Sequence, residues 1–131
     1  MPAVLALGLD PVFVDPQAMG GLSPAVIRAF IDSELDRIRA AGYEVESCLV
    51  DIGETAEAVL TEHLHKRSFD CVLIGAGLHA AEHALLFEKL LNLVHGLATQ
   101  AKICFNTKPQ DSLEAVQRWV VPTAGELRRS G

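Results

Sequence analysis

The chain has 131 residues, half of them apolar, and a formal net charge of −6 at pH 7. This length and composition suit one globular domain with a substantial hydrophobic core. The negative charge disfavours nucleic acid and anionic membrane as partners, because no cluster of lysine and arginine reverses it locally. We therefore expect a single domain over residues 1–122, followed by a short tail over residues 123–131.

The N-terminal run MPAVLALGLD lacks the basic segment that begins a signal peptide, and no apolar run is long enough to cross a membrane. The cysteines Cys48, Cys71 and Cys104 lie in apolar runs without a C-x-x-C motif. This placement is typical of buried, reduced thiols. We expect a cytoplasmic protein that holds neither a metal nor a cofactor.

Short apolar runs alternate along the chain with segments of helical periodicity. Within these runs apolar and polar residues do not alternate, which indicates strands buried on both faces, as in a parallel sheet. Ser23 precedes a proline at the first helical position, and Gly42 is placed to end the same helix. In chain order, the predicted elements are a strand over Ala3–Leu9, a helix from Pro24 to about Gly42, a strand over Val45–Ile52, a helix over about Thr55–Lys66, a strand over Cys71–Gly75, a helix over about Glu82–Gln100, a strand over Lys102–Phe105, and a helix from Asp111, with Glu114 in capping-box spacing, that ends at Pro122.

This order of elements predicts an α/β fold, a single three-layer α/β/α sandwich with a parallel four-stranded sheet. If the chain doubles back after the second strand, the strand order is 2-1-3-4. Ligands of such sheets bind outside the carboxyl ends of the strands, at the switch point between the first and third strands. Loop 10–23 borders this point, and its length and apolar residues suit a lid, a loop packed on the core or a contact surface.

Two short motifs occur where the third strand meets the following helix. The segment from Gly75 to Ala80 matches the G-x-G-x-x-A pattern of dinucleotide-binding turns, but its glycines precede the predicted helix by several residues. The segment from His79 to His83 reads H-x-x-E-H, a string found in zinc peptidases, but it straddles a loop and a helix start. We interpret the segment as a glycine turn beside the sheet crevice, suited to a smaller polar or anionic ligand.

Residues at the predicted strand ends form the candidate site. Asp10 ends the first strand, where doubly wound folds often have their chemistry. It could form an acid–base couple with His79, or simply begin a turn before Pro11. The candidate ligand-binding residues are Asp10, Gly75, Gly77, His79, Asn106 and Thr107.

The predicted helix over residues 82–100 is apolar over more than one helical stripe, with Phe87 and Leu91 widening the arc. A helix with so wide an apolar arc is buried from two sides. Because the sheet of one chain covers a single side, we expect a homo-oligomer, a dimer or larger, in which this helix meets another copy.

The segments VLIGAG, LLFEKLLNLVH, ICFNT and EAVQRWV together resemble a family of small bacterial α/β proteins of unknown function. The resemblance extends over most of the chain and implies no activity. The pattern is also similar to flavodoxin-like and Rossmann-like three-layer folds, although it lacks the phosphate loop of flavodoxins and the acidic phosphoacceptor of receiver domains.

Three functions stay open at this point. The leading prediction is binding of a small polar or anionic ligand at the carboxyl ends of the strands. The second is a small hydrolase that uses Asp10 and His79. The third is an oligomeric structural or interaction module without a ligand site.

Overall fold

The computed structural model describes residues 1–15, 17 and 20–122, so the tail predicted over 123–131 lies outside the described residues. Strands and helices alternate along the chain, as the sequence predicts, and short 3-10 turns precede three of the helices. The helices and strands are β1 (Ala3–Leu9), α1 (Pro24–Ala40), β2 (Glu44–Val50), α2 (Ala56–Lys66), β3 (Cys71–Ile74), α3 (Ala84–Leu97), β4 (Lys102–Phe105) and α4 (Ser112–Gln117), and the 3-10 turns are Pro11–Phe13, Ala81–His83 and Pro109–Asp111.

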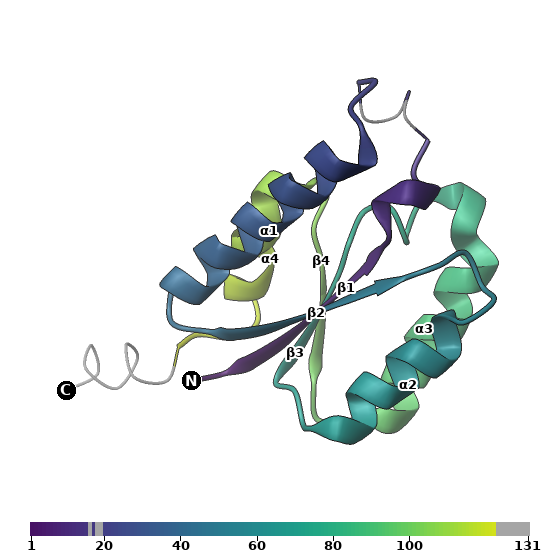
Figure 1. Cartoon of the computed structure of the whole chain (residues 1–131). Helices are drawn as coiled ribbons and strands as arrows, with labels where there is room; N and C mark the ends of the chain where they lie inside the picture. The colour runs from purple at the N-terminus through teal and green to yellow at the C-terminus, as the bar shows by residue number, and fades with distance from the viewer. Residues whose placement is uncertain (16, 18–19, 123–131) are drawn as a thin grey trace.

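The sheet has four strands in the order β2-β1-β3-β4, and every neighbouring pair is parallel. Figure 1 shows α1 and α4 on one side of the sheet and α2 and α3 on the other. The predicted three-layer α/β fold and the predicted strand order are therefore confirmed. No helix in the described part of the chain is both long enough and apolar enough to span a membrane.

Local signals in the sequence explain most of the helix ends. The Ser23 hydroxyl accepts a hydrogen bond from the Val26 amide at 3.3 Å and so caps α1. Gly42 follows α1 with a φ of +105°, which only glycine adopts without strain. The predicted Asp111–Glu114 capping box is wrong, because the Asp111 side chain makes no cap bond to α4 and instead accepts from the amide of Thr107 at 2.9 Å.

Some boundaries differ from the predictions. β2 begins at Glu44 and ends at Val50, and α3 begins at Ala84, after a 3-10 turn, instead of at Glu82. α4 is short and ends at Gln117, well before Pro122. Boundary residues depend on hydrogen bonds within individual turns, which apolar periodicity does not report.

The two faces of the central strand β1 differ in side-chain size. Leu5, Leu7 and Leu9 belong to the core cluster beneath α2 and α3. Val4 and Ala6 belong to the cluster beneath α1 and α4, and Gly8 continues their face because side chains of a strand alternate. The α1 side of the sheet therefore has less side-chain volume along its middle strand.

Candidate functional site

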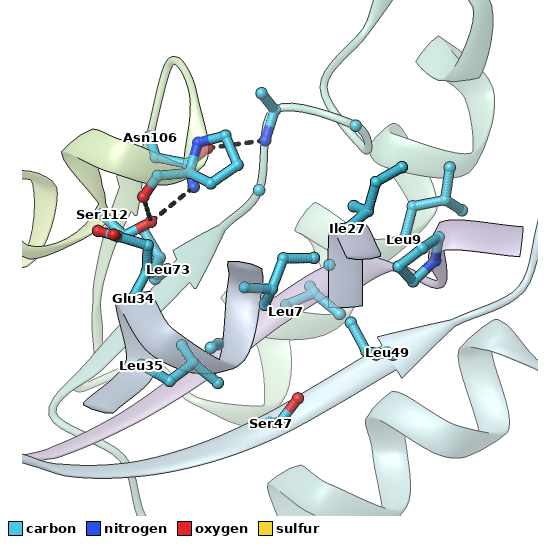
Figure 2. Close-up of a pocket in the computed structure, with 18 of the residues that line it drawn as sticks. Leu7, Leu9, Ile27, Glu34, Leu35, Ser47, Leu49, Leu73, Asn106 and Ser112 are labelled. Atoms are coloured by element: carbon cyan, nitrogen blue, oxygen red, sulfur yellow. Dashed lines mark hydrogen bonds between the residues drawn. The ribbon is translucent and has the colours of Figure 1, made fainter. Parts of the chain in front are cut away.

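A pocket of about 130 Å³ lies between α1 and the sheet, at the carboxyl ends of the strands. Its walls are mainly apolar and include Ile27 and Leu35 from α1 (Figure 2), together with Ile31 of the same helix. Pro11 and Val14, from the loop that follows β1, line it as well. This position agrees with the general rule that open parallel sheets bind ligands beyond their strand ends.

Small residues in the sheet explain why the pocket is open. Ala6 pairs with Ser47 of β2, and Gly8 pairs with Leu49. On the other side of β1, Gly75 follows β3 and donates its amide to the carbonyl of Leu7 at 2.9 Å. All of these positions line the pocket, and the small residues among them, Ala6, Gly8, Ser47 and Gly75, leave space below α1 that the protein does not fill.

Asn106 fixes one end of the pocket with both atoms of its amide group. Its Oδ1 accepts a hydrogen bond from the Ala76 amide at 2.8 Å, and its Nδ2 donates to the Ser112 hydroxyl at 3.0 Å. The Ser112 hydroxyl in turn donates to the carbonyl of Pro109 at 2.7 Å. This chain of bonds holds the turn after β3 against the start of α4, and it satisfies a polar residue that is only 7% exposed.

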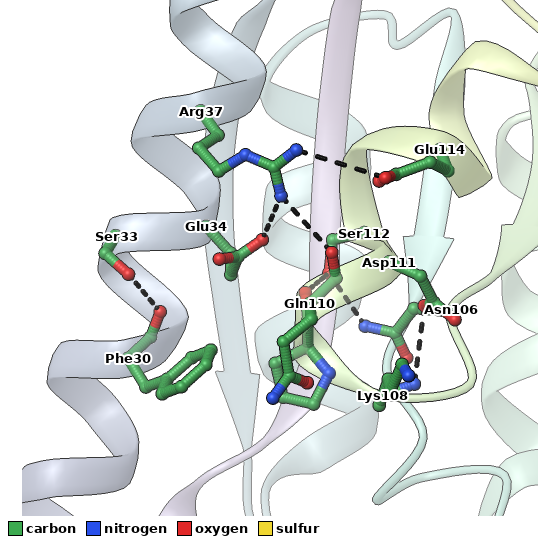
Figure 3. Close-up of polar contacts among 11 residues, drawn as sticks. Phe30, Ser33, Glu34, Arg37, Asn106, Lys108, Gln110, Asp111, Ser112 and Glu114 are labelled. Carbon is green, nitrogen blue, oxygen red and sulfur yellow. Dashed lines mark hydrogen bonds and ion pairs between the residues drawn. The ribbon is translucent and has the colours of Figure 1, made fainter.

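Glu34 is the charged residue of the pocket lining. It lies in the middle of α1 and is 8% exposed. Its Oε1 accepts a hydrogen bond from Nη1 of Arg37 at 2.8 Å, and the same Nη1 donates to the carbonyl of Gln110 at 3.2 Å. Figure 3 shows the Arg37 guanidinium between Glu34 and Glu114, so this arginine links α1 to the α4 side beside the pocket.

The structure divides the predicted site residues into two groups. Gly75, Gly77 and Asn106 line the pocket, whereas Asp10, His79 and Thr107 are not part of its lining. Asp10 forms an ion pair with Arg28 at 2.5 Å, and the Thr107 hydroxyl bonds the carboxylate of Asp111. The side chains of Asp10 and Thr107 therefore make contacts within the loops and helix around the pocket.

His79 lies in an aromatic cluster at the edge of the sheet. Its Nε2 bonds the carbonyl of Asn106 at 2.8 Å, and its ring centroid lies 5.2 Å from that of Phe105 and 6.3 Å from that of Phe87. Among the described residues, no hydrogen bond or ion pair joins His79 to Asp10. The acid–base couple between them therefore stays a hypothesis without support from these contacts.

Hydrogen bonds lower the pKa of two carboxyl groups that hold loops. Asp51, before α2, accepts from the backbone of Gly53 and from the side chain and backbone of Thr55, which lowers its pKa. Burial acts to raise the pKa of Asp111, but the bonds from the side chain and backbone of Thr107 and from the backbone of Lys108 outweigh it, so that pKa is also lowered. Both groups are thus held ionised by loop donors rather than poised for proton transfer.

The thiols are buried, as their apolar sequence neighbours predict. Cys71 and Cys104 lie on adjacent strands with their sulfur atoms 3.3 Å apart. The hydrogen bond between them and burial raise the pKa of Cys71, and burial raises the pKa of Cys48 to about 12. In the described part of the chain, no group of three or more histidine, cysteine or acidic residues is arranged to hold a metal ion.

The glycine turn after β3 does not begin a helix. Leu78 donates its amide to the carbonyl of Gly75 at 3.0 Å, which closes a turn, and α3 starts only after the 3-10 turn Ala81–His83. The glycines therefore do not place a ligand at the N-terminus of α3, the geometry that a dinucleotide-binding turn requires.

Sequence reasoning missed Glu34 and the apolar wall that α1 contributes. A glutamate three residues before an arginine in a helix is typical of a solvated ion pair, so nothing marked Glu34 as buried. A usable signal for the pocket did exist in the first strand. In AVLALGL, every second residue from Val4 is smaller than its leucine neighbours, which places the small residues on one face of the sheet.

No family model matches this chain, and no curated protein matches it. The resemblance to small bacterial α/β proteins therefore stays an expectation beyond the level of the α/β fold.

Proposed function

We propose that this protein binds a small molecule with a mainly apolar body in the pocket between α1 and the strand ends. The observation that supports this proposal is the pocket itself, about 130 Å³ in volume and lined mostly by aliphatic residues and glycines. Apolar cavities of roughly 150 Å³ bind molecules of the size of benzene. The lining thus favours a more apolar ligand than the polar or anionic one that the strand-end residues predict.

Thermal denaturation in the presence of benzene tests this proposal. A ligand that binds only the folded state stabilises it by about 2.7 kcal/mol at a concentration 100 times its Kd, so the midpoint of denaturation should rise by several degrees. Gly8→Val places a branched side chain in the pocket from a strand position that suits it, and we expect the shift to disappear.

Gly96→Ala is the matched control, because Gly96 lies in α3, and apart from its own stretch of helix no atom lies within 4 Å of a Cβ added there. This variant should keep the shift of the wild type. Equal shifts in the wild type and Gly8→Val, or no shift with any apolar probe, would contradict the proposal.

We also propose that two copies of the chain associate through α3, as its apolar arc predicts. Within one chain α2 already packs against α3, so part of the arc has a neighbour. Leu85, at the first turn of α3, is nonetheless 77% exposed. Analytical ultracentrifugation should find a dimer that Leu85→Ser dissociates and that Val26→Ser, at an exposed apolar residue of α1, leaves intact. A monomeric wild type at high protein concentration would contradict this proposal.

A further inference from the structure

The lining of the pocket has a single charged side chain among the described residues, and its charge is negative. Glu34 is the only ionisable residue in the described lining, which contains no lysine, arginine or histidine. An anionic ligand would therefore lose its hydration without meeting a cationic side chain, and it would lie near a carboxylate. Burial of a charge without a partner is strongly unfavourable.

The Glu34 carboxylate has unused capacity to accept hydrogen bonds. Arg37 donates to Oε1, while no donor among the described residues reaches Oε2. A carboxylate oxygen has more than one acceptor site, so Glu34 can bind a further donor without losing Arg37. The Arg37 side chain is 47% exposed, and its partial exposure to water weakens its neutralisation of the glutamate charge.

The other polar side chains of the lining offer few donors. The Nδ2 group of Asn106 donates to Ser112, and the hydroxyl of Ser112 donates to the carbonyl of Pro109. Ser47 is the remaining hydroxyl, at the opposite wall of the pocket on β2 (Figure 2). Among its polar side chains, the pocket therefore offers mainly a hydrogen-bond acceptor, the carboxylate of Glu34.

We propose that the ligand of this pocket has a hydrogen-bond-donating group, a hydroxyl or an amine, that binds the Glu34 carboxylate while its hydrocarbon body contacts Ile27 and Leu35. This inference rests on the proposed binding function and specifies its ligand class. It excludes carboxylates and phosphates as the group that enters the pocket.

Isothermal titration calorimetry with four probes of one size tests the inference. The probes are toluene, benzyl alcohol, benzylamine and benzoate, and each is titrated into the wild type, Glu34→Gln and Glu114→Gln. Glu34→Gln keeps the side-chain length but removes the carboxylate. Glu114→Gln is the matched control, because its carboxylate lies 4.0 Å from Arg37 but does not line the pocket.

We expect benzyl alcohol or benzylamine to bind the wild type at least about tenfold more tightly than benzoate. Glu34→Gln should reduce the preference for the donor probe over toluene by about tenfold and leave the Kd of toluene unchanged. Glu114→Gln should keep the preference of the wild type. If benzoate binds as tightly as the donor probes, or if Glu34→Gln leaves the preference unchanged while toluene still binds, the inference is wrong and the binding function stands. If none of the four probes binds, both are wrong.

Discussion

The two faces of the sheet use the same strands but are packed differently. Beneath α2 and α3, the leucines of β1 meet fully buried side chains such as Leu60 and Leu90. Beneath α1, the corresponding positions of β1 are Val4, Ala6 and Gly8, and the space that Ala6 and Gly8 leave is part of the pocket. One face therefore serves mainly stability, and the other has apolar surface available for a ligand.

The loop that follows β1 borders the pocket. Pro11 is buried and Val14 packs against the core cluster beneath α2 and α3, and both residues line the pocket. Val12, between them in sequence, is 58% exposed. This part of the loop is therefore packed on the core, as one of the interpretations predicts, and it also has exposed apolar surface near the pocket. Residues 16, 18 and 19 lie outside the described residues.

The largest expected effect comes from one truncation on each face. Leu90→Ala should lower the free energy of unfolding by about 3–4 kcal/mol, because the side chain is fully buried and its removal creates a new cavity. Leu35→Ala should cost only about 2 kcal/mol, because Leu35 already borders open space and loses fewer contacts. Urea denaturation measures both values, and equal losses would remove the distinction between the faces.

Asn106→Ala tests the polar bridge that belongs to the pocket side. We expect a loss of about 1–3 kcal/mol in the free energy of unfolding, because the Ala76 amide loses its acceptor and the Ser112 hydroxyl loses a donor. Asn92→Ala, at an exposed asparagine of α3, should change stability by less than about 0.5 kcal/mol. A similar loss in both variants would show that the bridge contributes nothing specific.

Gly8→Ala should stabilise the protein and weaken its proposed function together. A methyl group at Gly8 would lie 3.5 Å from Cδ2 of Leu49, an ordinary contact, so the variant fits without strain. Glycine within a strand costs roughly 0.5–1 kcal/mol relative to alanine, and this amount should appear as added stability in urea denaturation. A loss of stability would mean that the space at Gly8 is smaller than the structure indicates.

The smallest expected effect is a dependence of the free energy of unfolding on acidic pH. The pKa of Asp111 is lowered from 3.8 in the folded state, so its contribution to stability is present above that pH and is lost as the pH falls through the folded pKa. Wild type should therefore be more stable than Asp111→Asn near neutral pH, and the two should converge well below pH 3.8. Urea denaturation across this range checks the sign, and a constant difference at every pH would contradict it.

The fold was predictable because strands and helices of a parallel sheet differ strongly in apolar pattern. The run CVLI of β3 and the Ser23–Pro24 start of α1 both predict their elements from neighbouring residues alone. The strand order followed from the single assumption that the chain doubles back after the second strand.

The lining of the pocket was predictable only where it depends on strand ends. Gly75, Gly77 and Asn106 follow buried strands, and topology brings strand ends together, so the sequence predicts their position at the edge of the sheet where the pocket lies. Asp10 and His79 also lie at strand ends, but the direction of a side chain depends on contacts such as the Asp10–Arg28 pair. Glu34 is far in sequence from the end of any strand, and only the packing of α1 on the sheet makes it part of the lining.

The most direct test of the account is a nuclear magnetic resonance titration of the isotope-labelled protein with benzene. Saturable shifts should appear at Gly8, Ile27 and Leu35, which line the pocket, and should be absent at Leu64 and Val94 between the sheet and the opposite helices. Shifts centred on the α2 and α3 face, or no saturable shifts, would contradict the claim that the small residues of β1 open a binding site beneath α1.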